Sequence, residues 1–150
     1  MNTNTTLLSP PSLPRTLSPS TPPKPRLTKV LIIDDEAASV ANTRRILEAA
    51  GRFEIHASCS PLIGLELARQ IRPDVVILDI VMPVYDGGDV KHMLGKVPAL
   101  AQTPVILLSS MVGQDEANSD GFLMCGEDMV VPKPAHPVKL PALIRSLLKG

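Results

Sequence analysis

Four short, uninterrupted apolar runs recur along the chain, and segments of helical character separate them. The runs occupy residues 30–33, 75–78, 105–108 and 129–131. A strand that is apolar at every position is buried on both faces, as in a parallel sheet covered by helices on either side. Residues 53–58 alternate apolar and polar side chains instead, which predicts a half-buried strand at the edge of the same sheet.

Helical patterns fill the intervals between these runs and follow the last one. The predicted helices cover residues 37–50, 61–71, 88–94 and 115–124, and a last helix carries Leu140, Leu143, Ile144 and Leu147. Right-handed crossovers between the strands then give a doubly wound α/β domain. We predict a five-stranded parallel sheet of order 2-1-3-4-5, which is the flavodoxin-like arrangement.

Residues 1–28 differ in composition from the rest of the chain. Seven of them are Pro and ten are Ser or Thr, and the largest apolar cluster is Leu7-Leu8. Such a segment buries too little apolar surface to offset the entropy lost on ordering, so we predict a disordered tail followed by one domain over residues 29–150. Its Ser-Pro and Thr-Pro dipeptides allow a docking or phosphorylated tail. Such dipeptides arise easily in this composition, and an inert extension is the simpler interpretation.

Charge and hydropathy exclude several functional classes. The formal net charge is zero, divided into +4 for residues 1–29 and −4 for residues 30–150. A mildly acidic domain gives no support for a nucleic-acid-binding surface. No apolar run approaches the roughly 20 residues of a membrane span, and the N-terminus lacks a signal-peptide pattern. Cys59 and Cys125 have no metal-binding or redox spacing, which fits a reducing compartment, so we expect a cytoplasmic protein.

Charged and hydroxyl side chains follow four of the predicted strands at the point where each strand ends. They are Asp34 and Asp35 after the first strand, Asp79 after the third, Ser109 after the fourth and Lys133 after the fifth. Ligands of doubly wound sheets bind beyond the carboxyl ends of the strands, at the switch point of strand order. In the order 2-1-3-4-5 the first and third strands are neighbours there. We therefore expect the aspartates to share one pocket, with an ammonium and a hydroxyl group beside it.

Such a pocket suits magnesium-assisted phosphoryl chemistry. Clustered carboxylates repel one another, and Mg²⁺ relieves that repulsion by binding one or two carboxylates together with phosphate oxygens. Asp79 then has an oxygen that can attack phosphorus, while Lys133 and Ser109 can interact with the phosphoryl oxygens. Taken singly, Asp34 and Asp35 could instead cap the next helix, and Lys133 could be an ordinary solvated lysine. Taken together, an acid cluster without a cation would be costly, which favours the site.

Four segments, in this order and at this spacing, resemble the signature segments of a known family. They are IDDE (33–36), LDIVMPVYDGG (78–88), PVILLSS (104–110) and GEDMVVPKP (126–134), and they resemble those of two-component response-regulator receiver domains of the stand-alone, chemotaxis-regulator-like kind. Each segment alone is common, whereas all four together, each at a strand end, are highly specific.

The resemblance implies a role at each matching position. Asp79 would be the phosphoacceptor, and Asp34 and Asp35 would hold Mg²⁺ together with Asp79. The backbone carbonyl of Val81 would be a further metal ligand. Ser109 would be the switch hydroxyl and Lys133 the phosphate-binding cation. Family members often have a cis peptide bond at the position of Lys133-Pro134, which an X-Pro bond can tolerate.

The sequence departs from the family pattern at three positions. Receivers commonly have an aromatic residue three positions before the lysine, whose rotamer couples to the switch hydroxyl, and Val130 stands there. Valine has few rotamers and little reach, so the usual coupling is in doubt. Val81 and Met111, two positions after Asp79 and Ser109, are apolar where relatives can have side chains that position the hydrolytic water. We expect slow self-dephosphorylation.

The resemblance also implies the partners. The protein would receive a phosphoryl group from a histidine kinase or phosphotransfer protein and signal by binding a downstream protein target, with no output domain. We expect a monomer or weak dimer that binds neither nucleic acid nor membrane and is not an enzyme beyond its own slow hydrolysis. Two alternatives remain. One is an aspartyl-phosphate phosphatase, which would normally carry its nucleophile after the first strand. The other is a pseudo-receiver interaction module that works without phosphorylation.

Overall fold

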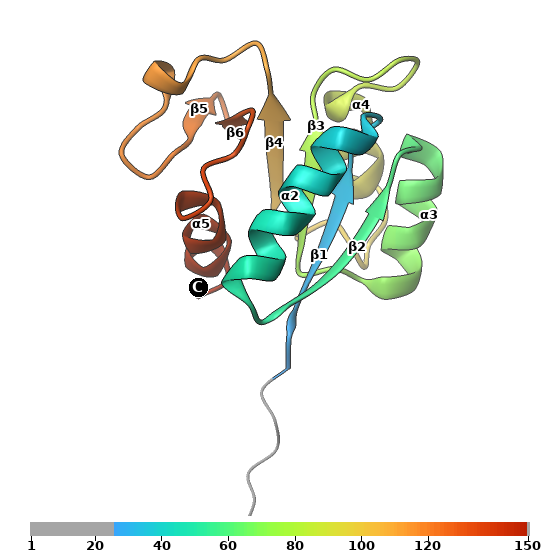
Figure 1. The fold of residues 1–150 in the computed structure, drawn as a ribbon. Helices are drawn as coiled ribbons and strands as arrows, with labels where there is room; N and C mark the ends of the chain where they lie inside the picture. The colour runs from blue at the N-terminus through green and yellow to red at the C-terminus, as the bar shows by residue number, and fades with distance from the viewer. Residues whose placement is uncertain (1–25, 150) are drawn as a thin grey trace, which may run out of the picture.

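The computed structural model describes residues 26–149, so the predicted tail lies outside the described residues except for its last three. The elements alternate along most of the chain (Figure 1). The strands are β1 (Thr28–Ile33), β2 (Phe53–Ser58), β3 (Val75–Asp79), β4 (Val105–Ser109), β5 (Leu123–Cys125) and β6 (Asp128–Pro132). The helices are α2 (Ala37–Ala50), α3 (Pro61–Ile71), α4 (Gly87–Gly95) and α5 (Lys139–Leu148), with a short 3₁₀ helix η2 at Gln114–Glu116.

One sheet joins all six strands in the order β2-β1-β3-β4-β6-β5. The first five strands of this order are parallel to one another, and they are the five strands predicted from the sequence, with β6 as the fifth. The predicted α/β class and the order 2-1-3-4-5 are therefore confirmed. The sixth strand, β5, was not predicted and pairs antiparallel with β6 at one edge of the sheet.

The predicted α-helix over residues 115–124 is wrong, because the 3₁₀ helix η2 ends at Glu116 and turns and strand β5 occupy the rest of this segment. The side-chain oxygen of Asn118 accepts hydrogen bonds from the backbone N–H groups of Asp120 and Phe122, an arrangement that competes with helix. Gly121 has a φ of 89° and Gly126 a φ of 65°. Gly126 is the first of two loop residues between β5 and β6, where a hairpin turn favours a positive φ.

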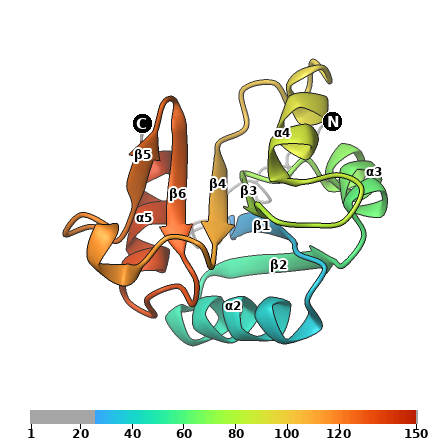
Figure 2. The ribbon, with the colours of Figure 1, turned by 90° about the horizontal axis from the view of Figure 1, so that it is seen from above.

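Two helices cover each face of the sheet (Figure 2). Because side chains alternate along a strand, neighbouring residues of β1, β3 and β4 enter different cores. One core packs Ile32 and Ile77 against α2 and α5, and the other packs Leu31 and Leu78 against α3 and α4. All four of these side chains are fully buried. Burial on both faces explains why the strands are continuously apolar in sequence.

Two close contacts and one ion pair fix the ends of the sheet. A Cβ at Gly87 would lie 2.7 Å from the carbonyl oxygen of Asp79, so the absence of a side chain lets α4 begin against the end of β3. Gly64 lies against Ile33 in the same way, which seats α3 beside the end of β1. At the opposite end of the sheet, Arg26 donates two hydrogen bonds to Asp74.

Within residues 26–149, no helix combines the length and the apolar character needed to cross a bilayer.

Candidate functional site

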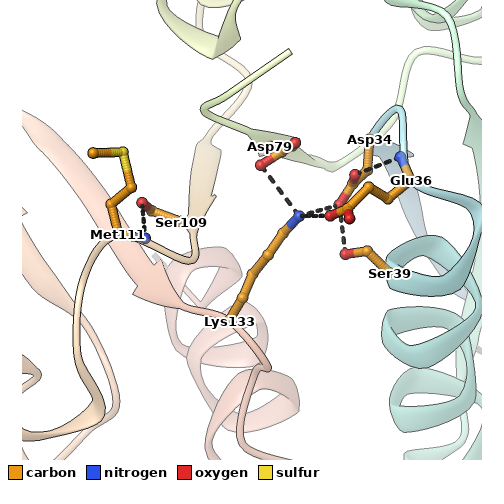
Figure 3. Close-up of polar contacts among 7 residues, drawn as sticks. All are labelled: Asp34, Glu36, Ser39, Asp79, Ser109, Met111 and Lys133. Carbon is orange, nitrogen blue, oxygen red and sulfur yellow. Dashed lines mark hydrogen bonds and ion pairs between the residues drawn. The ribbon is translucent and has the colours of Figure 1, made fainter.

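The predicted site residues lie together at the carboxyl end of the parallel strands (Figure 3). Asp34 follows β1, Asp79 ends β3, Ser109 ends β4, and Lys133 follows β6. Asp34 is 0% exposed, Asp79 is 4% exposed and Ser109 is 2% exposed. These are three of the four buried polar residues in the part of the chain that the structure describes. Such burial of carboxylates is costly unless they are paired, so their partners decide what the site does.

Lys133 provides the positive charge at the centre of the cluster. Its Nζ lies 2.9 Å from Asp34 Oδ2 and 3.2 Å from Asp79 Oδ1. Glu36 Oε1 is also within reach, at 3.3 Å, from the N-cap position of α2. The Lys133 side chain is only 12% exposed, so these carboxylates take the place of water around the ammonium group. The structure thus brings together Asp34, Asp79 and Lys133 as the strand-end pattern predicted.

Two further residues contact Asp34: Glu36, which belongs to the IDDE segment, and Ser39, which the sequence prediction did not include. The backbone N–H of Glu36 donates to Asp34 Oδ1 at 3.0 Å, and the hydroxyl of Ser39 donates to Oδ2 at 2.6 Å. Ser39 lies in the first turn of α2, immediately after the acidic segment. The position of Ser39, five residues after Asp34, could have indicated this contact. A helix that begins at the end of β1 places a hydroxyl in its first turn near the end of that strand.

The electrostatics of Asp79 follow from burial and from like charge. Burial raises the pKa of the Asp79 carboxyl above its ordinary value, and the charge of Asp34 raises it further. Lys133 and the backbone N–H of Val81 act in the opposite direction without cancelling this rise. For Lys133, burial lowers the pKa of the ammonium, but Asp34 and Asp79 outweigh burial and the net effect is a raised pKa. Burial and the neighbouring Asp34 thus disfavour the ionised form of Asp79, whereas the two aspartates favour the charged form of Lys133.

The donor set suits a hard divalent cation. Carboxylate oxygens of Asp34, Asp35 and Asp79 all lie within 4.8 Å of one another. Asp34 and Asp79 are buried, whereas Asp35 is exposed, so the cluster reaches from the interior to the surface. Magnesium prefers such oxygen ligands and keeps several waters, which an open side of the cluster permits. A cation would also relieve the repulsion that raises the pKa of Asp79.

Ser109 lies apart from the Lys133 cluster, on the other side of Asp79 in the view of Figure 3. Its Oγ accepts a hydrogen bond from the backbone N–H of Met111 at 3.0 Å. The two strand ends are joined by a backbone hydrogen bond from Lys133 N to the Ser109 carbonyl oxygen at 2.8 Å. The side chains of Val81 and Met111 are 54% and 78% exposed.

Two further expectations concern the strand that carries Lys133. The Lys133-Pro134 peptide bond is cis, as the resemblance implied. Val130, at the position where receivers commonly have an aromatic side chain, is 2% exposed and packs in the core against α3 and α4. A small, buried valine fills the interior instead of alternating between the core and the surface.

Comparisons with known proteins agree with this arrangement. Residues 30–145 match the response regulator receiver domain family. The probable transcriptional regulator ycf27 of Guillardia theta is 40% identical over 125 residues, which cover 81% of this chain and 45% of that protein. The DNA-binding dual master transcriptional regulator RpaA of Synechocystis is 32% identical over 123 residues, which cover 82% and 50%. The chain thus spans half or less of the length of these relatives.

Solved structures show the same fold over nearly their whole length. A response regulator from Desulfuromonas acetoxidans is 27% identical with a TM-score of 0.65, and the match covers 81% of this chain and 97% of that one. The chemotaxis protein CheY4 of Vibrio cholerae is 22% identical with a TM-score of 0.68, covering 81% and 99%, and supports the fold alone. The chain therefore belongs to the response regulator receiver domain family of two-component systems.

Proposed function

We propose that this protein accepts a phosphoryl group on Asp79 from a histidine kinase or phosphotransfer protein, and that phosphorylation changes its binding to a downstream protein target. The observation that carries the proposal is the position of Asp79 among the other charges. Its carboxylate lies 3.2 Å from the Lys133 ammonium and shares a cluster of oxygens with Asp34 and Asp35. When Asp79 forms an acyl phosphate, the negative charge moves from the buried carboxylate to the phosphoryl oxygens, which the Lys133 ammonium can stabilise.

The chemical step is a transfer between two nucleophiles. A carboxylate oxygen of Asp79 attacks the phosphorus of the donor's phosphohistidine, and the new O–P bond forms as the P–N bond breaks. The electron pair of the P–N bond leaves with the imidazole nitrogen, which takes a proton. The product is an aspartyl phosphate and a neutral donor histidine.

Each neighbouring residue has a part in this step. The Lys133 ammonium pairs with the carboxylate oxygens before the transfer and with the phosphoryl oxygens after it. The hydroxyl of Ser109 accepts the Met111 N–H, which leaves its own proton free to donate to a phosphoryl oxygen. Asp34, Asp35, Asp79 and the backbone carbonyl of Val81 would hold Mg²⁺. When bound, Mg²⁺ would supply positive charge that offsets the negative charge of the phosphoryl group.

The direct test uses a small phosphodonor, so that no partner protein is needed. We expect wild-type protein incubated with acetyl phosphate and Mg²⁺ to gain the mass of one phosphoryl group, and Asp79→Asn to gain none. An adduct on the wild type separates a receiver from an interaction module that works without phosphorylation, and omitting Mg²⁺ should abolish it. An adduct of equal yield in Asp79→Asn would place the acceptor elsewhere.

We also propose that the acyl phosphate hydrolyses slowly. The side chains of Val81 and Met111 are exposed and apolar, so neither can hold and orient an attacking water by hydrogen bonding. Adding a polar group at either position, in Val81→Asn or Met111→Glu, should shorten the lifetime of the phosphorylated form, measured by its loss of mass with time. A lifetime that is short in the wild type, or unchanged in both variants, would contradict this.

A phosphatase would behave differently in the same assays. It would turn over phosphomonoesters many times per molecule, whereas a receiver releases at most its own phosphate.

We propose that the output is protein binding in the cytoplasm by a monomer or weak dimer. The relatives named as transcriptional regulators share only the matched half of their length, so DNA binding is not carried over.

A further inference from the structure

We propose that Ser39 is a positioning residue of the metal site, whose hydroxyl fixes the Asp34 carboxylate and thereby sets the affinity for Mg²⁺. The inference rests on the proposed function only in taking the acid cluster as a Mg²⁺ site. Ser39 belongs to none of the four signature segments that identify the family, and its contact with Asp34 is visible only in the structure.

The hydrogen bond from Ser39 is a strong one by its geometry. The Ser39 Oγ to Asp34 Oδ2 distance of 2.6 Å lies within the range of about 2.5–2.7 Å for a hydroxyl that donates to a charged carboxylate. Asp34 is 0% exposed, so the loss of a donor leaves a buried carboxylate oxygen with one partner fewer. Ser39 itself is held on the first turn of α2, and that helix packs on the sheet through Ile46 and Leu47.

The same carboxylate oxygen carries a competing contact. Asp34 Oδ2 receives both the Ser39 hydroxyl at 2.6 Å and the Lys133 ammonium at 2.9 Å, while Oδ1 receives the backbone N–H of Glu36. Ser39 and Glu36 together hold one donor on each oxygen and so fix the plane of the carboxylate. Without Ser39, the carboxylate is free to turn toward Lys133, and a closer ion pair there removes a ligand from the cation.

Outer partners of metal ligands have measurable effects in other proteins. Their loss typically weakens metal affinity about 10–100-fold, because the ligand is no longer oriented. We therefore expect Ser39→Ala to bind Mg²⁺ about tenfold more weakly than wild type. Ser39→Thr keeps a hydroxyl at the same position and should restore most of the affinity. Ser110→Ala is a matched control, because Ser110 is exposed and lines the same cleft as Ser39.

Isothermal titration of Mg²⁺ into the four metal-free proteins measures this affinity without reference to phosphorylation. The thermal midpoint of each metal-free protein, recorded in parallel, shows that the variants are folded.

The outcomes separate this inference from the proposed function. Wild-type affinity in Ser39→Ala, or a loss that Ser39→Thr does not restore, would overturn the positioning role. A wild-type protein that binds no Mg²⁺ would overturn it as well. Weaker Mg²⁺ binding in Ser39→Ala combined with no adduct on wild-type Asp79 would support the positioning role while refuting the proposed phosphoacceptor function.

Discussion

Two groups, each pairing a basic side chain with aspartate, lie at opposite ends of the sheet and differ in the pKa of their aspartates. At the carboxyl end, Lys133 pairs with Asp34 and Asp79, and the three side chains are 12%, 0% and 6% exposed. At the amino end, Arg26 pairs with Asp74, and their side chains are 66% and 21% exposed. The first group is therefore almost fully removed from water, whereas in the second the Arg26 side chain remains solvated and Asp74 is only partly buried.

The pKa values record this difference. Burial and the nearby Asp34 raise the pKa of Asp79, whereas the hydrogen bond from Arg26 lowers the pKa of Asp74 against a smaller effect of burial. Arg26 forms an ion pair with Asp74 alone, but Lys133 forms ion pairs with Asp34, Glu36 and Asp79. Ionisation of Asp79 in the site therefore lowers the stability of the folded state, whereas ionisation of Asp74 in the amino-end pair raises it.

Removing the base from each group should show the largest contrast. Lys133→Met leaves Asp34 and Asp79 buried without a counter-charge, and we expect the free energy of unfolding to fall by about 3 kcal/mol. Arg26→Met breaks an exposed pair, so its effect should be much smaller. Urea unfolding at neutral pH without Mg²⁺ measures both. Equal losses would mean that burial does not distinguish the two groups.

Adding Mg²⁺ should affect only one group. At a concentration ten times its dissociation constant, Mg²⁺ should raise the free energy of unfolding of the wild type by about 1.4 kcal/mol. Asp74→Asn should gain the same amount, and Asp79→Asn much less, since it lacks one ligand of the cluster. A chelator should reverse the gain. If Asp79→Asn gains as much as wild type, Mg²⁺ binds elsewhere.

The two aspartates should also have opposite effects on stability as the pH changes. Asp79 has a raised pKa when folded, so its ionisation costs stability as the pH rises above 3.8, the ordinary value of an aspartate carboxyl. Asp74 has a lowered pKa, so its contribution is present above 3.8 and is lost as the pH falls through its folded pKa. At neutral pH without Mg²⁺, Asp79→Asn should therefore stabilise the protein, and Asp74→Asn should destabilise it.

Unfolding curves for both variants and wild type at neutral and acidic pH test this. The two differences should shrink toward zero in acid, where both carboxyls are protonated in either state. Effects of the same sign at neutral pH would contradict the opposite pKa directions.

Salt should produce the smallest effect. The Arg26–Asp74 pair is exposed, so ions screen it, and the destabilisation caused by Arg26→Met should fade as sodium chloride is raised. The larger destabilisation caused by Lys133→Met should persist, because ions reach a buried pair poorly. Parallel salt dependence of the two variants would show that solvent reaches both groups alike.

The sequence predicted the parts of the fold that follow from repeated, local patterns. Strands buried on both faces must be apolar at every position, which is why β1, β3, β4 and β6 were recognisable. The convergence of Asp34, Asp79 and Lys133 followed from sheet order alone, since carboxyl ends of parallel strands share one edge. The functional roles of these residues remain predictions until the phosphodonor and Mg²⁺ experiments are done.

The parts that the sequence did not predict depend on contacts between distant residues. Strand β5 has only three residues, and pairing with β6, not its own periodicity, makes it a strand. Arg26 and Asp74 are 48 residues apart, and no pattern links them. Ser39 reaches the site only because of the direction in which α2 leaves β1.

The pairing of β6 has a mechanical consequence for Lys133. Strand β6 is bonded to β5 through Asp128–Val130 and to β4 through Met129–Pro132, and Lys133 follows its last residue. A force applied at Lys133 along the strand is therefore carried first by the hydrogen bonds with β4, and the ladder with β5 begins three residues further back. The travel left to the ammonium group is that of its flexible aliphatic stem, which can swing between neighbouring oxygens while the strand stays in place.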